Sequence, residues 1–312
     1  MRGCARRPDR RARERGGPSW AVSQRFRGVP EGAESSPSPL VVAASARPAG
    51  TRDDMTTLYQ FDISPFCDKV RRVLRAKHLD FRIVEVPPSE AARGRWKEIS
   101  PTGKFPVLEH DGRRIFDSTD IVRYLDERFP EPRLIPADPV LAARVHVLED
   151  WADEALYFFE MTMRLTWPEN AERWVPILLA VEKPLVRRLF APLLPRAIRR
   201  VTEAQGIGRK ARDDVERELG RHLDALVAWL GDGAWLVGET LTLADIAVYA
   251  QLFCIQGAIT GDEAIAARPA LVAWMDRVDA ATTRVEDETA TLVRSGEAEE
   301  MEAEAAVDAR DD

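Results

Sequence analysis

The apolar and polar positions of residues 56–129 switch between strand spacing and helix spacing. The run "TTLYQF" (56–61) is rich in β-branched and aromatic residues and predicts a short strand buried on both faces, and the alternating run "FRIVEV" (81–86) predicts a second strand. Between them, Ser64 is a good helix N-cap, and Pro65 suits the first helical position, where its missing N–H costs nothing. The apolar residues that follow keep close to the spacing of one helical face: Phe66, Val70, Val73, Leu74 and Leu79.

Four further elements are predicted in the same segment. "SEAARGRWKEI" (89–99) indicates a shorter helix, and "FPVLEHDGRRIF" (105–116) contains Asp111-Gly112, the pair that closes a two-residue β-hairpin. "STDIVRYLDERF" indicates a helix that starts with Ser118 as its cap. The order is therefore β-α-β-α-β-β-α, and a right-handed crossover makes the first two strands parallel. This is the thioredoxin-like layout.

After the Pro-rich linker "FPEPRLIPAD" the pattern becomes entirely helical. Val140–Leu165 is predicted as one long helix, another begins near Lys210, and the last begins near Pro269. In "LTLADIAVYAQLFCI", Thr242 is the expected N-cap and Asp245 can return the capping-box bond, so Asp245 is interpreted as a folding residue and not as a catalytic carboxylate. The fold class expected is α/β plus all-α, with a thioredoxin-like N-domain followed by a helical bundle C-domain.

The segment 174–210 is interrupted by prolines and carries basic residues interleaved with Leu, Val and Ile. Four prolines are too many for one continuous helix: Pro176, Pro184, Pro192 and Pro195. Two interpretations stay open. The segment is either a set of short helices that fold over the domain cleft as a lid or dimer surface, which we favour, or a helix that lies on a membrane surface.

Charge and composition divide the chain further. The 312 residues carry a net charge of −7, but residues 1–54 hold eleven arginines, no lysine and six acidic residues, a net charge of +5 that leaves −12 for the rest. An acidic body argues against a nucleic-acid surface, which needs clustered cations. No window approaches eighteen uninterrupted apolar residues, so no membrane span is expected. We expect five parts: a disordered Arg-rich extension (1–54), a thioredoxin-like domain (55–130), a linker (131–140), an all-helical domain (141–285) and an acidic tail (286–312). Met55, which follows the extension, is a candidate for the true start of the protein. The tail is expected to be solvated or to form a frayed helix.

Three cysteines lie far apart in the sequence: Cys4, Cys67 and Cys254. Their odd number, the lack of a C-x-x-C pair and four scattered histidines support neither a disulfide framework nor a metal site. A reduced, cytoplasmic protein without a metal is expected.

Ser64 and Cys67 lie at the amino end of the first predicted helix, where unpaired N–H groups and the helix dipole favour an anion. A thiolate placed there, from the protein or from a bound thiol, has a lowered pKa, and a hydroxyl donor would stabilise it further. The residues alone leave alternatives open, because Ser64 would serve equally as an N-cap and Cys67 as a small buried hydrophobe.

Four motifs, "SPFCDKVRRVL", "ISPTGKFPVLEHDG", "FDSTDIVRYLDERFP" and "LTLADIAVYA", together resemble the glutathione transferase superfamily over roughly residues 55–279. The resemblance implies the glutathione transferase fold and glutathione as a co-substrate. It places Ser64 at the position that stabilises the glutathione thiolate, and Cys67 at the second, dispensable cysteine of a C-P-x-C motif.

The same resemblance assigns the residues that would hold glutathione. Pro106 matches the cis-proline that lets Phe105 offer its backbone N–H and C=O to the cysteinyl part. Asp117 and Ser118 match the acidic-Ser pair that receives the γ-glutamyl end, although Asp117 is shorter than the usual Glu or Gln. Lys104, with Arg93 or Arg95, is a candidate for the glycine carboxylate.

The function expected is conjugation of the glutathione thiolate to a small apolar electrophile, with neither a metal nor a nucleic acid as a partner. The resemblance also implies a homodimer. An apolar acceptor pocket and ordinary core are both compatible with a group of large side chains on the long helix: Tyr157, Phe158, Phe159, Met161, Met163 and Trp167. Two alternatives remain: a glutaredoxin-like thiol reductase or glutathione lyase that uses Cys67, and a non-catalytic interaction or stress protein that keeps the fold.

Overall fold

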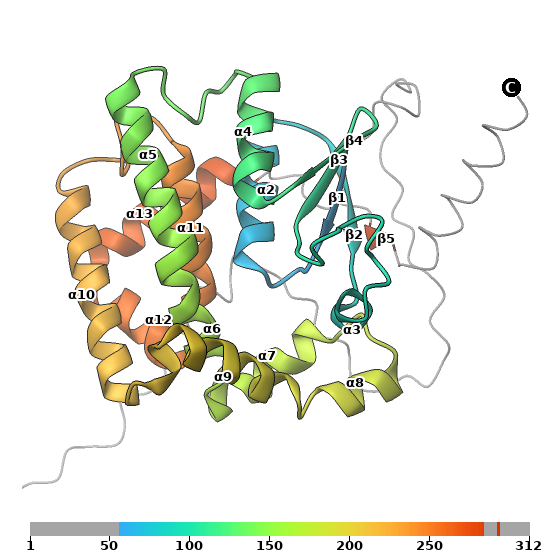
Figure 1. The fold of residues 1–312 in the computed structure, drawn as a ribbon. Coiled ribbons are helices and arrows are strands. Elements are labelled where there is room, and N and C mark those ends of the chain that lie inside the picture. The colour runs from blue at the N-terminus through green and yellow to red at the C-terminus, as the bar shows by residue number, and fades with distance from the viewer. Residues whose placement is uncertain (1–55, 284–291, 294–312) are drawn as a thin grey trace, which may run out of the picture. The chain divides into compact units, whose positions relative to one another are not determined.

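The computed structural model describes residues 56–283 and 292–293. The first part of the chain has the predicted element order (Figure 1): β1 (Thr56–Gln60), α2 (Pro65–Ala76), β2 (Phe81–Glu85), α3 (Pro88–Ala92), β3 (Val107–His110), β4 (Arg113–Phe116) and α4 (Ser118–Arg128). The strand order in the sheet is β4-β3-β1-β2-β5, where β5 is the two-residue strand Leu292–Val293. As predicted, β1 and β2 are parallel, and β3 and β4 form an antiparallel hairpin.

Backbone conformations explain where the sequence predictions succeeded and failed. The hairpin turn has Asp111 and Gly112 at φ of 50° and 66°, the left-handed values that a two-residue turn of this kind needs. The helix predicted over 89–99 is shorter, because α3 ends before Gly94, whose φ of 73° is not helical. The expectation that Ser118 caps α4 was wrong by one residue: Asp117 is the N-cap, and Ser118 is the first helical residue.

The second part of the chain is helical, as predicted. Its elements are α5 (Pro139–Trp151), the π-helical η2 (Ala152–Leu156), α6 (Tyr157–Leu165), α7 (Pro168–Leu178), α8 (Pro184–Phe190), α9 (Leu194–Gln205), the 3₁₀ turn η3 (Ile207–Arg209), α10 (Arg212–Leu230), α11 (Leu243–Ile255), α12 (Ile259–Ala266) and α13 (Pro269–Thr282). The helix predicted over 140–165 is thus interrupted by a π-helical turn. Three of the four prolines separate short helices, as the sequence indicated: Pro184 begins α8, Pro192 lies between α8 and α9, and Pro195 lies in the first turn of α9. Pro176 is the exception, because it lies inside α7.

Helix α11 is the centre of the packing. It contacts α2 on one side and α5 and α6 on the other, and nearly all of its residues are buried (Figure 1). Its start is fixed by the predicted capping box, in which Asp245 accepts hydrogen bonds from the Thr242 N–H (3.0 Å) and hydroxyl (2.8 Å). Asp245 also accepts from the Trp274 indole at 3.0 Å, so this carboxylate serves the fold, as expected.

Two sets of predictions fall partly outside this structure. The Arg-rich extension and most of the acidic tail lie outside the described residues. Within the tail, Leu292–Val293 are described and form a strand beside β2, where the sequence had indicated a solvated or frayed helix. None of the helices within the described ranges is long and apolar enough to cross a membrane.

Candidate active site

Ser64 lies at the N-cap position of α2, at the end of the short loop that follows β1. It is half-buried, and its backbone has the extended conformation of an N-cap. No helix N–H donates to its hydroxyl, however, so the side chain does not perform the capping role that its position suggests. The hydroxyl lies at the positive end of a twelve-residue helix without capping it, and it interacts with the Cys67 thiol instead.

Cys67 is wholly buried beneath the same helix end. Its side chain belongs to a core cluster with Tyr59, Val84 and Val107. Burial raises the pKa of the Cys67 thiol to about 12, and the charge of Arg71 and hydrogen bonding with Phe61 and Ser64 offset that rise only in part. A reactive cysteine has the opposite properties, a lowered pKa and access to solvent.

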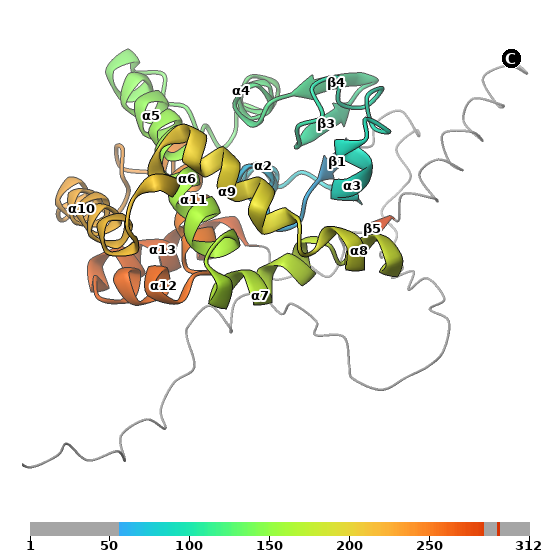
Figure 2. The same cartoon turned by 60° about the horizontal axis from the view of Figure 1, so that its bottom comes forward.

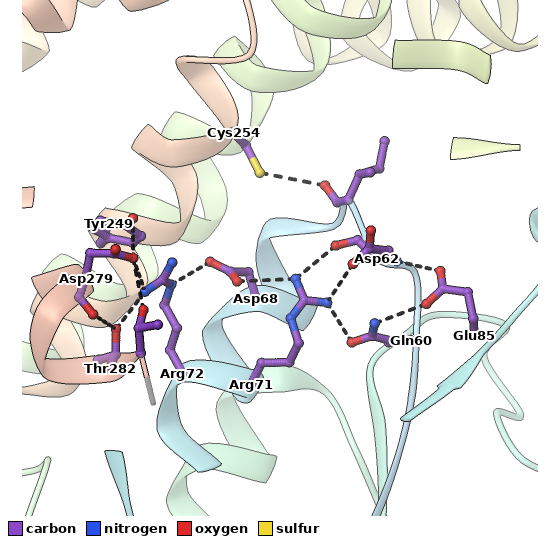
Figure 3. Close-up of polar contacts among 12 residues, drawn as sticks. Gln60, Asp62, Asp68, Arg71, Arg72, Glu85, Tyr249, Cys254, Asp279 and Thr282 are labelled. Atoms are coloured by element: carbon purple, nitrogen blue, oxygen red, sulfur yellow. Dashed lines mark hydrogen bonds and ion pairs between the residues drawn. The ribbon is translucent and has the colours of Figure 1, made fainter. Parts of the chain in front are cut away.

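A buried polar network holds the loop between β1 and Ser64 on the side of α2 and the sheet (Figure 3). The Arg71 guanidinium donates to Gln60 Oε1 at 2.7 Å, to the Asp62 carbonyl at 2.9 Å and to Asp68 at 3.2 Å. On the other side, Glu85 accepts from the Asp62 N–H at 2.6 Å and from Gln60 Nε2 at 3.0 Å. Four side chains from β1, β2 and α2 thus hold the backbone that leads to Ser64.

Helices α6 and α11 hold the same loop through the backbone carbonyl of Ile63. Arg164 donates to the Ile63 carbonyl at 2.8 Å, and the Cys254 thiol lies 3.7 Å from the same oxygen. Arg164 is itself buried, paired with Glu160 and placed over the Trp174 ring at 4.9 Å. Sequence reasoning missed this contact, although a lone arginine inside the apolar run of α6 was a signal that a buried polar partner exists.

Glu85 makes the stability of this loop dependent on pH. Burial, with a contribution from the charge of Asp62, raises the pKa of Glu85 from 4.5 to about 7. Because the folded chain holds this proton more tightly than the unfolded chain, Glu85 lowers the free energy of unfolding as pH rises from about 4.5 to about 7, by about 3 kcal/mol in all. We expect Glu85→Gln to unfold in denaturant with a flatter pH dependence than the unmodified chain over this window. The exposed Glu127→Gln is the control; an unchanged pH dependence in Glu85→Gln would contradict the assignment.

The predicted cis-proline is confirmed, because the Phe105–Pro106 peptide bond is cis. Phe105 is buried, and its ring meets that of Phe61 edge to face with centroids 5.1 Å apart. Phe61 belongs to the loop that carries Ser64. The start of β3 and the Ser64 loop are therefore neighbours, as the expected glutathione site requires.

Asp117 occupies an unusual backbone position at the start of α4. Its φ is 69° with ψ of 133°, a sparsely populated region for a residue other than glycine, and such outliers cluster at ligand sites. The side chain is exposed and accepts from the Thr119 N–H at 2.9 Å, whereas Ser118 is buried. One carboxylate oxygen is thus used as the helix cap, and the exposed carboxylate can accept from a ligand as well.

A chain of polar contacts links this corner to the helical domain. The Thr119 hydroxyl donates to Glu149 at 2.6 Å, and Glu149 accepts from the Lys69 ammonium at 2.7 Å. Lys69 also donates to Asp153 at 2.5 Å. The two ends of the expected glutathione site, α2 and α4, are therefore both tied to the Glu149 carboxylate of α5, and α2 is tied to Asp153 of η2 as well.

The three candidate cations for a glycine carboxylate differ in their surroundings. Arg93 lies over the Phe190 ring at 5.6 Å, and Arg95 lies 3.5 Å from Glu90. Lys104 is exposed and has no ion pair with any residue in the described part of the chain. Lys104 is therefore the cation most available to a ligand.

The large side chains predicted to line a pocket or a core fall into two groups. Phe159, Met163 and Trp167 are buried in the main core cluster, and Met161 is buried in a smaller cluster that includes Ile63. Tyr157 and Phe158 are only partly buried, and the Tyr157 ring meets Phe66 of α2 with centroids 4.7 Å apart. Phe66 comes two residues after Ser64 in the chain, and with Tyr157 it forms a half-buried aromatic contact between the first turn of α2 and α6. Among the described residues, no group of three or more His, Cys, Asp or Glu side chains could hold a metal ion.

Comparison with known proteins agrees with this geometry. The family model "Glutathione S-transferase, N-terminal domain" matches residues 58–133, and "Glutathione S-transferase, C-terminal domain" matches residues 186–281. Protein LigF of Sphingobium sp. (strain NBRC 103272 / SYK-6) is 30% identical over 237 residues, which cover 72% of this chain and 89% of LigF. This chain belongs to the glutathione S-transferase superfamily.

Two further similarities extend the comparison. The crystal structure of beta-etherase LigF from Sphingobium sp. strain SYK-6 superimposes with a TM-score of 0.50 and 27% identity, covering 72% of this chain and 95% of that one. A stringent starvation protein A homolog of Pasteurella multocida (strain Pm70) is 27% identical over 180 residues, 52% of this chain and 84% of that protein. The superfamily uses glutathione as its co-substrate, and the thioredoxin-like and helical domains expected from the sequence are those of this transferase fold.

Proposed function

We propose that this transferase-family chain binds glutathione with its sulfur at Ser64 and conjugates it to an apolar electrophile. The observation that carries the proposal is the Ser64 hydroxyl, which lies at the amino end of α2 and accepts no bond from the helix. A donor in that place can hydrogen-bond a thiolate, and the helix dipole lowers the pKa of the thiol further.

The remaining contacts follow the three parts of glutathione. Asp117 would pair with the γ-glutamyl ammonium, while Ser118 and the N–H groups that open α4 would hold the γ-glutamyl carboxylate. The backbone of Phe105, turned by the cis bond to Pro106, would pair with the cysteinyl unit. Lys104 would face the glycine carboxylate.

The chemical step needs no covalent enzyme intermediate. The bound thiolate would attack the electrophilic carbon, the new C–S bond would form, and the leaving group or the opened ring would take the displaced electron pair. The contribution of the protein is a lowered thiol pKa and proximity. The half-buried Phe66, Tyr157 and Phe158 provide an apolar surface for the electrophile. The relative described as a beta-etherase adds β-ethers to the electrophiles to be tested.

Two other functions have less support. A reductase or lyase that uses Cys67 would need an accessible, acidic thiol, and Cys67 is wholly buried with a pKa raised to about 12. A non-catalytic role is kept as a second candidate because a stringent starvation protein is among the relatives. That role predicts no saturable glutathione binding. The homodimer expected from the sequence also remains a proposal.

Calorimetric titration of the full chain with reduced glutathione tests the site. Asp117→Asn is the informative variant, because asparagine keeps the helix cap and tolerates the positive φ but removes the charge. We expect saturable binding to the unmodified chain and about tenfold weaker binding to Asp117→Asn, the loss of one charge-assisted hydrogen bond. The exposed Asp120→Asn, in the same helical turn, should bind as the unmodified chain does. No heat of binding at millimolar glutathione would leave only the non-catalytic candidate.

A further inference from the structure

Helix α8 and the start of α9 expose apolar side chains that the proposed catalytic function does not use. None of the residues of α8 is buried. Leu185 and Leu189, which are four residues apart and so share a helical face, are 69% and 60% exposed, and Leu193 in the turn before α9 is 56% exposed. In Figure 2, α8 lies at one end of the group formed by α7, α8 and α9, although it lies between the other two in the sequence. An exposed group of large apolar side chains is a common sign of an interaction surface.

Helix α9 continues the pattern with two distinct faces. Its inner face packs into the helical domain through Leu194, Ile198 and Thr202. One position earlier in each turn, Leu193, Ala197 and Val201 are exposed, and Arg196 and Arg200 flank them. The helix is therefore already seated on the protein by one face, and the outward face needs no unfolding to be used.

The same segment concentrates positive charge. Residues 183–202 contain six basic residues and no acidic one, which leaves a net charge of −13 for the rest of the chain. All six are exposed and none forms an ion pair with another described residue: Lys183, Arg187, Arg188, Arg196, Arg199 and Arg200. Two of the six donate hydrogen bonds to backbone carbonyls: Arg196 donates to Pro192 at 2.6 Å, and Arg199 donates to Thr166 at 3.4 Å. The cations lack an anionic partner within the described structure.

The combination of leucines and unpaired cations restricts what can cover this surface. A symmetric contact between two copies would place the six cations of one copy against the six of the other, which like-charge repulsion opposes. An asymmetric contact between copies would repeat from one copy to the next and build a ring or an open filament. A nucleic acid would pair with the arginines but would leave the leucines in water. An anionic bilayer meets both requirements, because its headgroups attract the arginines and its interface accepts apolar side chains.

We propose that residues 183–202 form a docking surface for anionic phospholipid bilayers. The helices would lie on the membrane and not span it. This inference is independent of the proposed catalysis, and it takes up the membrane-surface alternative that the sequence analysis left open for this segment.

Vesicle co-sedimentation of the full chain tests the docking surface. We expect the unmodified chain to bind vesicles of phosphatidylglycerol mixed with phosphatidylcholine in low salt, to bind them less in high salt, and not to bind phosphatidylcholine alone. The double variant Arg187→Gln/Arg188→Gln should bind the anionic vesicles about 30-fold more weakly, from about 1 kcal/mol for each lost cation. Leu185→Ser/Leu189→Ser should weaken binding about tenfold or more through lost burial in the interface. The control is Val140→Ser/Val147→Ser, which removes comparably exposed apolar residues from α5 and should bind normally.

Three results would overturn the proposal. The first is an absence of binding to anionic vesicles in low salt, or equal binding by both variants and the control. The second is light scattering that shows a dimer converted to monomers by Leu185→Ser/Leu189→Ser, which would make the surface an interface between copies. The third is binding of a DNA oligonucleotide that depends on Arg187 and Arg188 while anionic vesicles are ignored.

Discussion

Replacing Ser64 with alanine is expected to lower kcat/KM for glutathione conjugation by about 100- to 1,000-fold, the usual effect of removing one donor that stabilises a reacting anion. The expected loss is catalytic and not structural. Since no helix N–H bonds to the Ser64 hydroxyl, its removal takes no cap from α2. The variant should therefore unfold at the same denaturant concentration as the unmodified chain. The measurement is steady-state turnover across a panel of apolar electrophiles, with unfolding followed in parallel.

Cys67→Ala provides the matched comparison three residues along the same helix. Because Cys67 is wholly buried, this variant should keep most of the turnover and lose some stability to the cavity that forms. The reverse pattern, with turnover abolished in Cys67→Ala and retained in Ser64→Ala, would contradict the assignment and support a cysteine-based reaction.

Replacing Lys69 with methionine is expected to cost about 3–5 kcal/mol of the free energy of unfolding, the largest stability effect predicted for a single position. Lys69 is 1% exposed and lies between Glu149 at 2.7 Å and Asp153 at 2.5 Å. Without the ammonium, two carboxylates at the contact between α2 and the helical domain would be buried with no cation between them. Denaturant unfolding measures the loss.

Two further variants separate this explanation from a simple loss of packing. Lys104→Met, at an exposed lysine without an ion pair in the described structure, should leave the free energy of unfolding nearly unchanged. Adding Glu149→Gln and Asp153→Asn to Lys69→Met should restore part of the lost stability, because the uncompensated charges are then removed. A loss below about 1 kcal/mol in Lys69→Met would show that water or a rearrangement satisfies the two carboxylates.

Local patterns in the sequence were sufficient for most of the fold. The Asp111-Gly112 pair identified the hairpin, and Thr242 with Asp245 identified the start of α11, because turns and caps depend on residues a few positions apart. The same local reasoning placed the cap of α4 at Ser118 when Asp117 holds it. Both residues are good N-caps, and only the backbone conformation of Asp117 distinguishes them.

The contacts that hold the candidate site could not be predicted in this way. Arg164 meets the carbonyl of Ile63 across about a hundred positions of sequence, and Lys69 meets Glu149 across eighty. Such pairs depend on how α2 and the loop before it pack against α5 and α6, and no short pattern encodes that packing. The roles of Ser64, Asp117 and Lys104 came from resemblance to a family, whereas their exposure and partners came from the structure.

The most direct test of the central claim is the ionisation of glutathione bound to the full chain, followed by the ultraviolet absorbance of the thiolate as pH is raised. We predict that the bound thiol ionises with a pKa well below the value of about 8.5 typical of a free thiol, and that Ser64→Ala returns it toward that value. A bound thiol that ionises as it does in free solution, or a lowered pKa that Ser64→Ala leaves unchanged, would contradict a catalytic role for Ser64.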